Sequence, residues 1–183
     1  KGGYIYISNM LINKFKYLKG NSFSLFLKIL IDEADNGIKD YNKDDLLSIG
    51  KVSTISLERY LKDLVSVELL IKRKAKLRQD GERTEYYINP KYKDFNFGYE
   101  KFRASTVENL HLQLKQNELK VYYYLILKSG NNGFKKSKRN IGEDLGIDHS
   151  SITKITNKLE ELGYIKKINE GEGFYQSNKY LVR

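Results

Sequence analysis

Apolar residues recur at helical spacing in two stretches of the chain that lie about 96 residues apart. Residues 21–33 and 117–128 are both predominantly apolar, with apolar positions three and four residues apart. A helix that is apolar over most of its surface is usually buried. Each stretch begins with an asparagine, Asn21 or Asn117, whose side chain can accept a hydrogen bond from a free N–H group of the first turn. The pattern predicts one central helix in each half of the chain.

A shorter helix is predicted after each central helix, at about residues 43–49 and 138–145. Each of these stretches is followed by a glycine, Gly50 or Gly146. Glycine has no Cβ atom and therefore adopts most readily the left-handed backbone conformation with which many helices end. We expect both short helices to end at these glycines.

A third helix is predicted after a turn of three or four residues, at about residues 54–67 and 149–162. The residue before each helix, Ser53 or Asp148, is a favourable N-cap because its side-chain oxygen can accept from backbone N–H groups. Apolar residues then recur along one side of the helix, as in helices that pack into a core. The residues expected to be buried are Leu57, Tyr60 and Leu64 in the first half and Ile152, Ile155, Leu159 and Leu162 in the second.

Two β-strands are predicted after each third helix. They cover residues 70–77 and 84–88 in the first half, and residues 164–168 and 179–182 in the second. Glycine between the two strands of a pair is typical of a β-hairpin. These glycines are Gly81, Gly171 and Gly173.

The two halves align with each other when the sequence is shifted by 96 residues up to Gly146 and by 95 residues beyond it. The matched pairs include Phe26 with Tyr122, Leu30 with Ile126, Gly50 with Gly146, Leu57 with Ile152 and Leu64 with Leu159. An ordered series of matches is typical of an internal duplication. The predicted fold class is α+β, mainly α-helical with small β-hairpins, in two tandem domains of the same kind. We expect domains at residues 1–90 and 103–183, joined by a linker at residues 91–102.

The expected linker carries aromatic residues that alternate with polar ones. Phe95, Phe97 and Tyr99 follow the only proline of the chain, Pro90. A flexible linker has no need for such alternation. We therefore expect an extended segment that packs an apolar face against the domains, so that the chain is a covalent pseudo-dimer.

The element order in each half resembles a winged helix-turn-helix domain. Residues 140–154 (NIGEDLGIDHSSITK) and 159–167 (LEELGYIKK) are similar to helix 2, the turn, the recognition helix and the entry to the wing in many bacterial regulators. The first half departs from this pattern at Glu68, which stands where the second half has Gly163. The resemblance implies two winged helix-turn-helix domains, each of which places its third helix in the major groove of DNA.

Charge indicates the kind of partner. The chain has 33 Lys and Arg against 23 Asp and Glu, a formal net charge of +10. Residues 1–97 contain 18 basic and 13 acidic residues, and the remainder contains 15 and 10, so each half carries +5. A basic excess is typical of proteins that bind phosphate-rich partners. Because both halves share the excess, we expect both to contact double-stranded DNA.

The second half offers a short, polar and basic face on its third helix, which suits hydrogen bonding to base edges and phosphates. Further basic residues flank this face on the preceding helix and at the base of the hairpin. The residues expected to contact DNA are Lys138, Arg139, His149, Ser150, Ser151, Lys154, Asn157, Lys158 and Lys167.

The first half is more ambiguous, because Glu58 and Asp63 lie among the cations of its third helix. Its hairpin is strongly basic, and such wings often follow the DNA backbone or place an Arg in the minor groove. An alternative is that this half contacts protein. The residues expected to contact DNA are Ser53, Thr54, Ser56, Arg59, Lys62, Arg73, Lys74, Lys76, Arg78 and Arg83.

Several kinds of chemistry lack the residues they need. The chain has no cysteine, which excludes disulfides and thiolate metal sites and fits the cytoplasm. Its two histidines, His111 and His149, lack carboxylates at metal-binding spacing, and no phosphate-binding loop is present. The longest apolar run, residues 121–127, is too short to span a membrane. We expect no enzyme activity, no metal and no cofactor.

The stretches at residues 6–11 and 103–107 resemble the short strand that leads into the winged helices of phage replisome organisers and plasmid replication initiators. The sequence therefore predicts a sequence-specific binder of double-stranded DNA that acts in plasmid or phage replication or in its transcriptional control. An alternative is a protein-docking module within a larger complex. The sequence leaves open whether two copies of the chain associate and whether the chain binds another protein.

Overall fold

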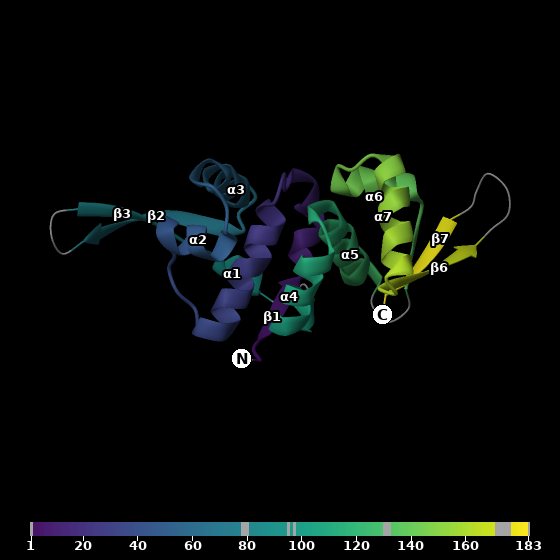
Figure 1. Cartoon of the computed structure of the whole chain (residues 1–183), viewed down its shortest axis with the longest axis horizontal. Helices are drawn as coiled ribbons and strands as arrows, with labels where there is room; N and C mark the ends of the chain where they lie inside the picture. Colours follow the sequence, from purple (N-terminus) through teal and green to yellow (C-terminus); the bar gives the residue numbers. More distant parts are fainter. Residues whose placement is uncertain are drawn as a thin grey trace. The chain divides into compact units, whose positions relative to one another are not determined.

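The computed structural model describes residues 2–77, 81–94, 96, 98–129, 133–170 and 177–182 (Figure 1). The chain divides into two compact units, each made of two segments. Unit 1 comprises Lys1–Ser8 and Leu18–Leu112, and unit 2 comprises Asn9–Tyr17 and Gln113–Arg183. These units differ from the expected domains at both ends of the linker, because residues 91–112 belong to unit 1. Residues 9–17, near the start of the chain, belong to unit 2.

The described residues of unit 1 form four α-helices, a β-hairpin and a second pair of strands that joins its two ends. Its main elements are β1 (Tyr4–Ser8), α1 (Ser22–Asn36), α2 (Lys43–Gly50), α3 (Thr54–Ser66), β2 (Leu70–Leu77), β3 (Gly81–Ile88), the 3₁₀ helix η3 (Pro90–Lys93), β4 (Tyr99–Arg103) and α4 (Ala104–Gln113). Strand β2 pairs antiparallel with β3, and β1 pairs antiparallel with β4. The long-range pair β1–β4 holds the residues expected to form a linker within unit 1.

The core of unit 1 forms where α1 packs against α2 and α3. Leu57 and Leu64 are fully buried and Tyr60 is nearly so, as their spacing on α3 predicted. Phe23 and Phe26 of the apolar helix α1 fill the same core. Because α3 buries one side, its opposite side is exposed.

Unit 2 has a similar order of helices with a three-stranded sheet. Its elements are the 3₁₀ helices η1 (Asn9–Asn13) and η2 (Phe15–Tyr17), then α5 (Gln116–Ser129), β5 (Phe134–Lys136), α6 (Lys138–Leu145), α7 (His149–Glu161), β6 (Ile165–Glu170) and β7 (Ser177–Val182). The antiparallel sheet has the order β5-β7-β6. Helix α7 packs on α5 and α6, while η2 lies against α6. The predicted core residues Ile152, Ile155 and Leu159 are all buried.

The expected capping by an asparagine side chain is wrong at both central helices. Asn21 precedes α1, but its side chain makes no capping hydrogen bond. Helix α5 begins at Gln116, so Asn117 lies inside its first turn. There the Glu118 carboxylate accepts a hydrogen bond from the Lys115 backbone N–H at 2.8 Å. At this helix end a carboxylate of the first turn, rather than an asparagine, accepts from the backbone.

The ends of the short helices were predicted correctly in one unit only. Gly146 ends α6 with the expected left-handed backbone, at φ 65°. Gly50, in contrast, is the last residue of α2, and Lys51 takes the left-handed conformation at φ 52°. The expected match of Gly50 with Gly146 is therefore wrong, and α2 corresponds to α6 with an offset of 95 residues.

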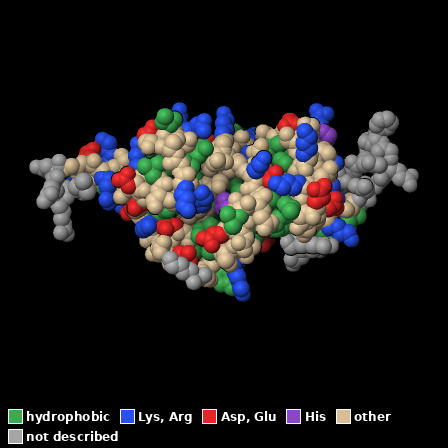
Figure 2. Space-filling view, viewed as in Figure 1, with side chains coloured by type: hydrophobic (Ala, Val, Ile, Leu, Met, Phe, Trp, Pro, Cys, Tyr) green, Lys and Arg blue, Asp and Glu red, His purple; other side chains and the backbone are tan. Residues whose placement is uncertain are grey.

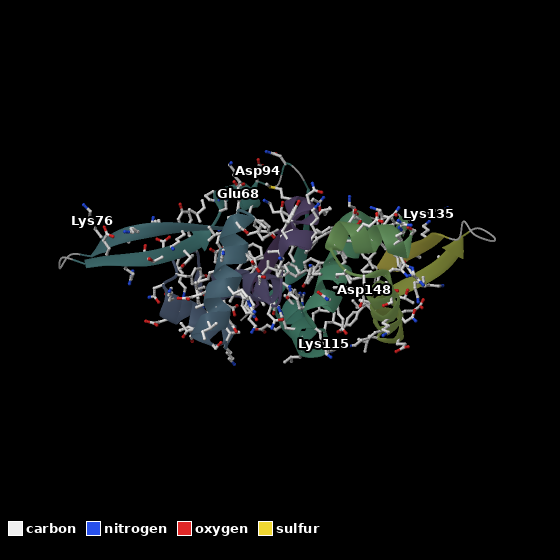
Figure 3. The ribbon with its side chains drawn as sticks, turned by 90° about the horizontal axis from the view of Figure 1, so that it is seen from above. Glu68, Lys76, Asp94, Lys115, Lys135 and Asp148 are labelled. Atoms are coloured by element: carbon white, nitrogen blue, oxygen red, sulfur yellow. The ribbon has the colours of Figure 1, made fainter. Side chains whose placement is uncertain are left out.

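The junction after the third helix has the same backbone conformation in both units. Gly163 has φ 78°, and Glu68 adopts φ 59° despite its side chain (Figure 3). The backbone N–H of the next residue, Leu69 or Tyr164, donates to the carbonyl five residues earlier, at 3.0 and 2.9 Å. Glu68 therefore does not interrupt the connection from α3 to β2.

The segment between residues 90 and 103 packs within unit 1 through a residue that the sequence analysis did not single out. Tyr92 is buried, and its hydroxyl accepts from the Ser8 N–H at 3.1 Å and donates to the Tyr6 carbonyl at 3.2 Å. Tyr99, expected on a packed face, keeps 46% of its surface exposed. Phe95 and Phe97 lie outside the described residues, as do Gly171 and Gly173.

Both expected entry strands have different bounds. Residues 4–8 form β1, which includes the start of the stretch at residues 6–11. In the stretch at residues 103–107, only Arg103 belongs to a strand, and α4 begins at Ala104.

The difference between Leu159 and Leu162 tests how α7 packs. Leu159 is fully buried, whereas Leu162, expected in the same stripe, is 44% exposed at the helix end. We expect Leu159→Ala to lower the free energy of unfolding by about 2–5 kcal/mol, as deletion of buried leucine generally does. Leu162→Ala, the matched control, should cost about 1 kcal/mol or less. Urea denaturation followed by circular dichroism measures both, and equal losses would contradict this packing.

Lys120 is a buried cation in the middle of α5, with only 3% of its surface exposed. Its Nζ donates to the carbonyl of Leu145, the last residue of α6, at 3.2 Å. Burial lowers the pKa of Lys120 from 10.5 to about 8. Between these values the unfolded chain binds more protons than the folded chain, so stability rises with pH in this window.

We expect the free energy of unfolding to rise by about 2 kcal/mol between pH 7 and pH 9.5 through this single group. Lys120→Met keeps an unbranched apolar chain without the charge, and the variant should lack this contribution. Urea denaturation of both proteins at the two pH values gives the difference. A parallel pH dependence in both proteins would show that Lys120 keeps its proton in the folded state.

Candidate nucleic-acid interface

The turn between α6 and α7 is held by a close approach of backbone to backbone. A Cβ atom on Gly142 would lie 2.4 Å from the Ile147 carbonyl oxygen, so only glycine fits at this point of α6. The Ile147 N–H donates to the Gly142 carbonyl at 2.9 Å. With Gly146 in the left-handed conformation between them, these contacts set the direction in which α7 leaves the turn.

Asp148 caps α7 as predicted (Figure 3). Its Oδ1 accepts from the Ser150 hydroxyl at 2.6 Å and from the Ser151 N–H at 2.8 Å. The hydrogen bond from the Ser150 hydroxyl contributes most to holding the pKa of Asp148 well below its usual range, and the hydrogen bonds from Ser151 add to this effect. The carboxylate is therefore occupied in satisfying the helix end.

The outer face of α7 carries three of the residues that the sequence predicted to contact DNA. Ser150, Lys154 and Asn157 are all exposed and follow each other at helical spacing, with the buried Leu159 on the opposite side. Ser151 and Lys158 lie at the edge of this face and are half-buried. The exposed row has hydrogen-bond donors and acceptors, and it carries no carboxylate.

Two lysines near this row hold acidic partners that the sequence analysis did not identify. Lys158 pairs with Glu118 of α5 at 2.7 Å. Lys167 pairs with Glu160 at 2.9 Å, and its Nζ also donates to the Asn157 side-chain oxygen at 2.6 Å. Lys158 thus ties α7 to α5, and Lys167 orients Asn157. Glu118 lies forty positions from Lys158, and Glu160 lies seven positions from Lys167. At these separations no local sequence pattern indicates the pairing.

The other basic residues predicted in unit 2 lie on α6 and at the start of α7. Arg139 is exposed and pairs with Glu143 one turn later at 3.1 Å. Lys138 is half-buried and His149 is exposed. Lys154 is exposed and makes no ion pair with the residues that the structure describes.

Helix α3 of unit 1 presents a similar face with one apolar member. Ile55, Arg59 and Lys62 are exposed at the same helical spacing as the row of α7. Arg59 and Lys62 were predicted to contact DNA, whereas Ile55, which is 83% exposed, was not. Arg59 lies over the Tyr60 ring at 5.4 Å.

The remaining predicted residues of α3 surround its N-terminus. The Ser53 hydroxyl accepts from the Ser56 N–H at 3.3 Å, and Ser53 is therefore the N-cap. Thr54 is exposed and Ser56 is half-buried.

The two carboxylates that made α3 ambiguous both have partners. Glu58 forms an ion pair with Lys43 at 2.7 Å, and this neighbour lowers the pKa of Glu58. Asp63 accepts from the Ser22 hydroxyl at 3.0 Å. Neither carboxylate belongs to the row of Ile55, Arg59 and Lys62.

Much of the positive charge on the hairpin of unit 1 is neutralised in place. Glu85 of β3 is nearly buried and lies opposite Arg73 of β2. Its carboxylate accepts hydrogen bonds from Arg83 and Arg73. Both hydrogen bonds lower the pKa of Glu85, and the one from Arg83 has the larger effect. Arg73 also pairs with Asp40, and Lys74 pairs with Glu82 at 2.8 Å.

Two hairpin lysines are left without an ion pair among the described residues, Lys72 and Lys76, and both are exposed. Figure 3 shows Lys76 near the outer end of the hairpin, away from the helices. Lys72 lines a groove of about 520 Å³ between α3 and the hairpin, together with Lys43, Glu58, Lys62 and Thr84. Arg78 lies outside the described residues.

On the face drawn in Figure 2, Lys and Arg side chains are dispersed over both units, with Asp and Glu among them. The described residues contain no group of three or more potential metal ligands. None of the helices described is long and apolar enough to cross a membrane.

Residues 109–180 match the protein family described as sugar-specific transcriptional regulator TrmB. The match spans α5, β5, α6, α7 and β6 and reaches into β7. No curated protein matches the chain. The similarity supports a winged helix-turn-helix of the kind found in DNA-binding transcriptional regulators for this part of the chain.

Proposed function

We propose that the protein binds double-stranded DNA and regulates transcription, with α7 as a recognition helix in the major groove. The observation that carries this proposal is the exposed row Ser150, Lys154 and Asn157, which has hydrogen-bonding groups and a cation but no carboxylate. An α-helix fits the major groove, where base pairs present distinct patterns of donors and acceptors. The similarity of residues 109–180 to transcriptional regulators supports the same assignment.

Unit 1 acts as a second DNA-binding unit in this proposal, and the chain is a covalent pseudo-dimer that arose by internal duplication. The support is the shared order of elements and the constant offset of 95 residues from α2 and α6 through the third helices. Lys51 and Gly146 keep this offset, as do the caps Ser53 and Asp148.

A role in plasmid or phage replication, or in its control, is the narrower form of the proposal. It rests on the resemblance of residues 6–11 and 103–107 to the entry strands of replication initiators. The proposed activity is binding rather than catalysis, and the proposed compartment is the cytoplasm.

Protein docking by unit 1 is the second candidate function. The neutralised hairpin favours it, because Arg73 and Arg83 are both held by Glu85 and offer less charge to phosphates. Loss of DNA binding by unit 2 variants alone, with no effect of any unit 1 variant, would favour this second function.

Salt dependence tests whether the positive charge faces DNA. Selection from pooled random duplexes, followed by sequencing of the bound fraction, first provides a target. If about six phosphates are neutralised, log affinity should fall with log salt at a slope of about −5. Fluorescence anisotropy at several salt concentrations measures the slope. An affinity that does not change with salt would contradict a role of the charge excess in DNA binding.

Asn157 and Lys76 should differ in how their loss affects target and scrambled duplexes. Asn157→Ala should weaken target binding by about 1–3 kcal/mol and leave scrambled DNA nearly unchanged, because a base contact carries sequence information. Lys76→Ala should weaken binding to both duplexes similarly, because a phosphate contact carries no sequence information. It should also reduce the salt slope by about one, because one fewer phosphate is neutralised.

Arg73→Ala is the matched control on the same strand, since Arg73 already holds two acidic partners. Its effect on the salt slope should be smaller than that of Lys76→Ala. If Asn157→Ala weakened both duplexes equally, α7 would not be reading sequence.

A further inference from the structure

Ile55 is the second residue of α3, and 83% of its surface is exposed. Helical geometry places it almost opposite Leu57 and Leu64, which are fully buried. Its side chain therefore contributes little to the core of unit 1. A β-branched residue also loses χ1 freedom in a helix, so the helix itself gains nothing from isoleucine at this position.

The surroundings of Ile55 are polar and positively charged. Arg59 and Lys62 continue its row, one and two turns further along α3, and both are exposed. Thr54 is exposed beside it, and the nearest carboxylate on the helix, Glu58, is held by Lys43. A partner that fits this face is negatively charged and presents a small apolar group close to the N-terminus of α3.

The position matches the reading end of the helix. The N-terminal residues of a recognition helix contact base edges in the major groove. With the offset of 95 residues, the row Ile55, Arg59 and Lys62 corresponds to Ser150, Lys154 and Asn157 on α7. Ile55 thus stands where α7 has the Ser150 hydroxyl, which donates to Asp148 and can accept a hydrogen bond from a base.

We propose that Ile55 is a specificity-determining residue that packs against the C5-methyl group of a thymine in the major groove. The thymine methyl is the apolar group that a base pair displays there, and apolar side chains contact it. In this arrangement, Arg59 and Lys62 contact backbone phosphates next to the same thymine. The inference rests on the proposed function and adds a base preference to unit 1.

Uracil substitution removes this methyl group and changes nothing else in the base pair. Each thymine of the selected target duplex is replaced in turn by deoxyuridine, and the affinity of the full chain is measured. We expect one or two positions at which the wild-type protein binds about 3–5-fold more weakly, the effect of one buried methyl group. Ile55→Ser should bind the thymine and uracil forms of those positions equally.

Ile38→Ser is the matched control. Ile38 is 77% exposed in the segment between α1 and α2 and does not belong to α3. This variant should keep the full preference for thymine. Thermal unfolding by circular dichroism should be unchanged in both variants, because both side chains are exposed.

Three results would overturn the inference. The first is a wild-type protein that binds the target but discriminates at no thymine, which would leave the proposed function intact. The second is an Ile55→Ser variant that still discriminates at the same positions. The third is loss of the preference in Ile38→Ser as well. Failure to select any duplex would instead overturn the proposed function and the inference together.

Discussion

The backbone contact between Gly142 and Ile147 is the constraint on which the surface of unit 2 depends. It allows the chain to leave α6, pass through a left-handed residue and begin α7 within a few residues. The buried side chains of α7 then fix its rotation about its own axis, so the row Ser150, Lys154 and Asn157 faces outward. A larger residue at Gly142 would move the whole helix, and every exposed group on α7 would change position with it.

Ion pairs decide which of the basic residues are available to a partner. Glu85, Glu118 and Glu160 each hold at least one cation that the sequence alone assigns to DNA. These ion pairs leave the net charge of +10 unchanged. Several of the cations, however, stabilise contacts within a unit and are less available to a partner. Lys158 ties two helices together, and Lys167 orients an asparagine. Lys62, Lys76 and Lys154 are exposed and form no such pair with the described residues, so they are better placed for phosphate contacts.

The sequence predicted the features that depend on local periodicity. The third helices and their buried residues, apart from Leu162, follow from apolar spacing, and Gly146 follows from the backbone freedom of glycine. Features that depend on contacts between residues far apart in the sequence were missed. Nothing local marks the pairing of β1 with β4, the burial of Tyr92 or the assignment of residues 9–17 to unit 2. Gly50 misled the prediction because a buried glycine inside a helix and a helix-ending glycine look alike in sequence. In the candidate site, Lys154 and Asn157 were predicted from the sequence, whereas exposed Ile55 and the acidic partners of the lysines were not.

The two outward rows differ in chemistry although they share their spacing. One carries Ile55, Arg59 and Lys62, and the other carries Ser150, Lys154 and Asn157. A homodimer presents the same recognition helix twice and therefore favours a target with two-fold symmetry. A chain that joins two different rows has no such restriction. If both helices read DNA, the apolar residue on α3 and the hydroxyl and amide on α7 favour different bases. The preferred target should then consist of two unlike half-sites, one of them with a thymine at the position that Ile55 contacts.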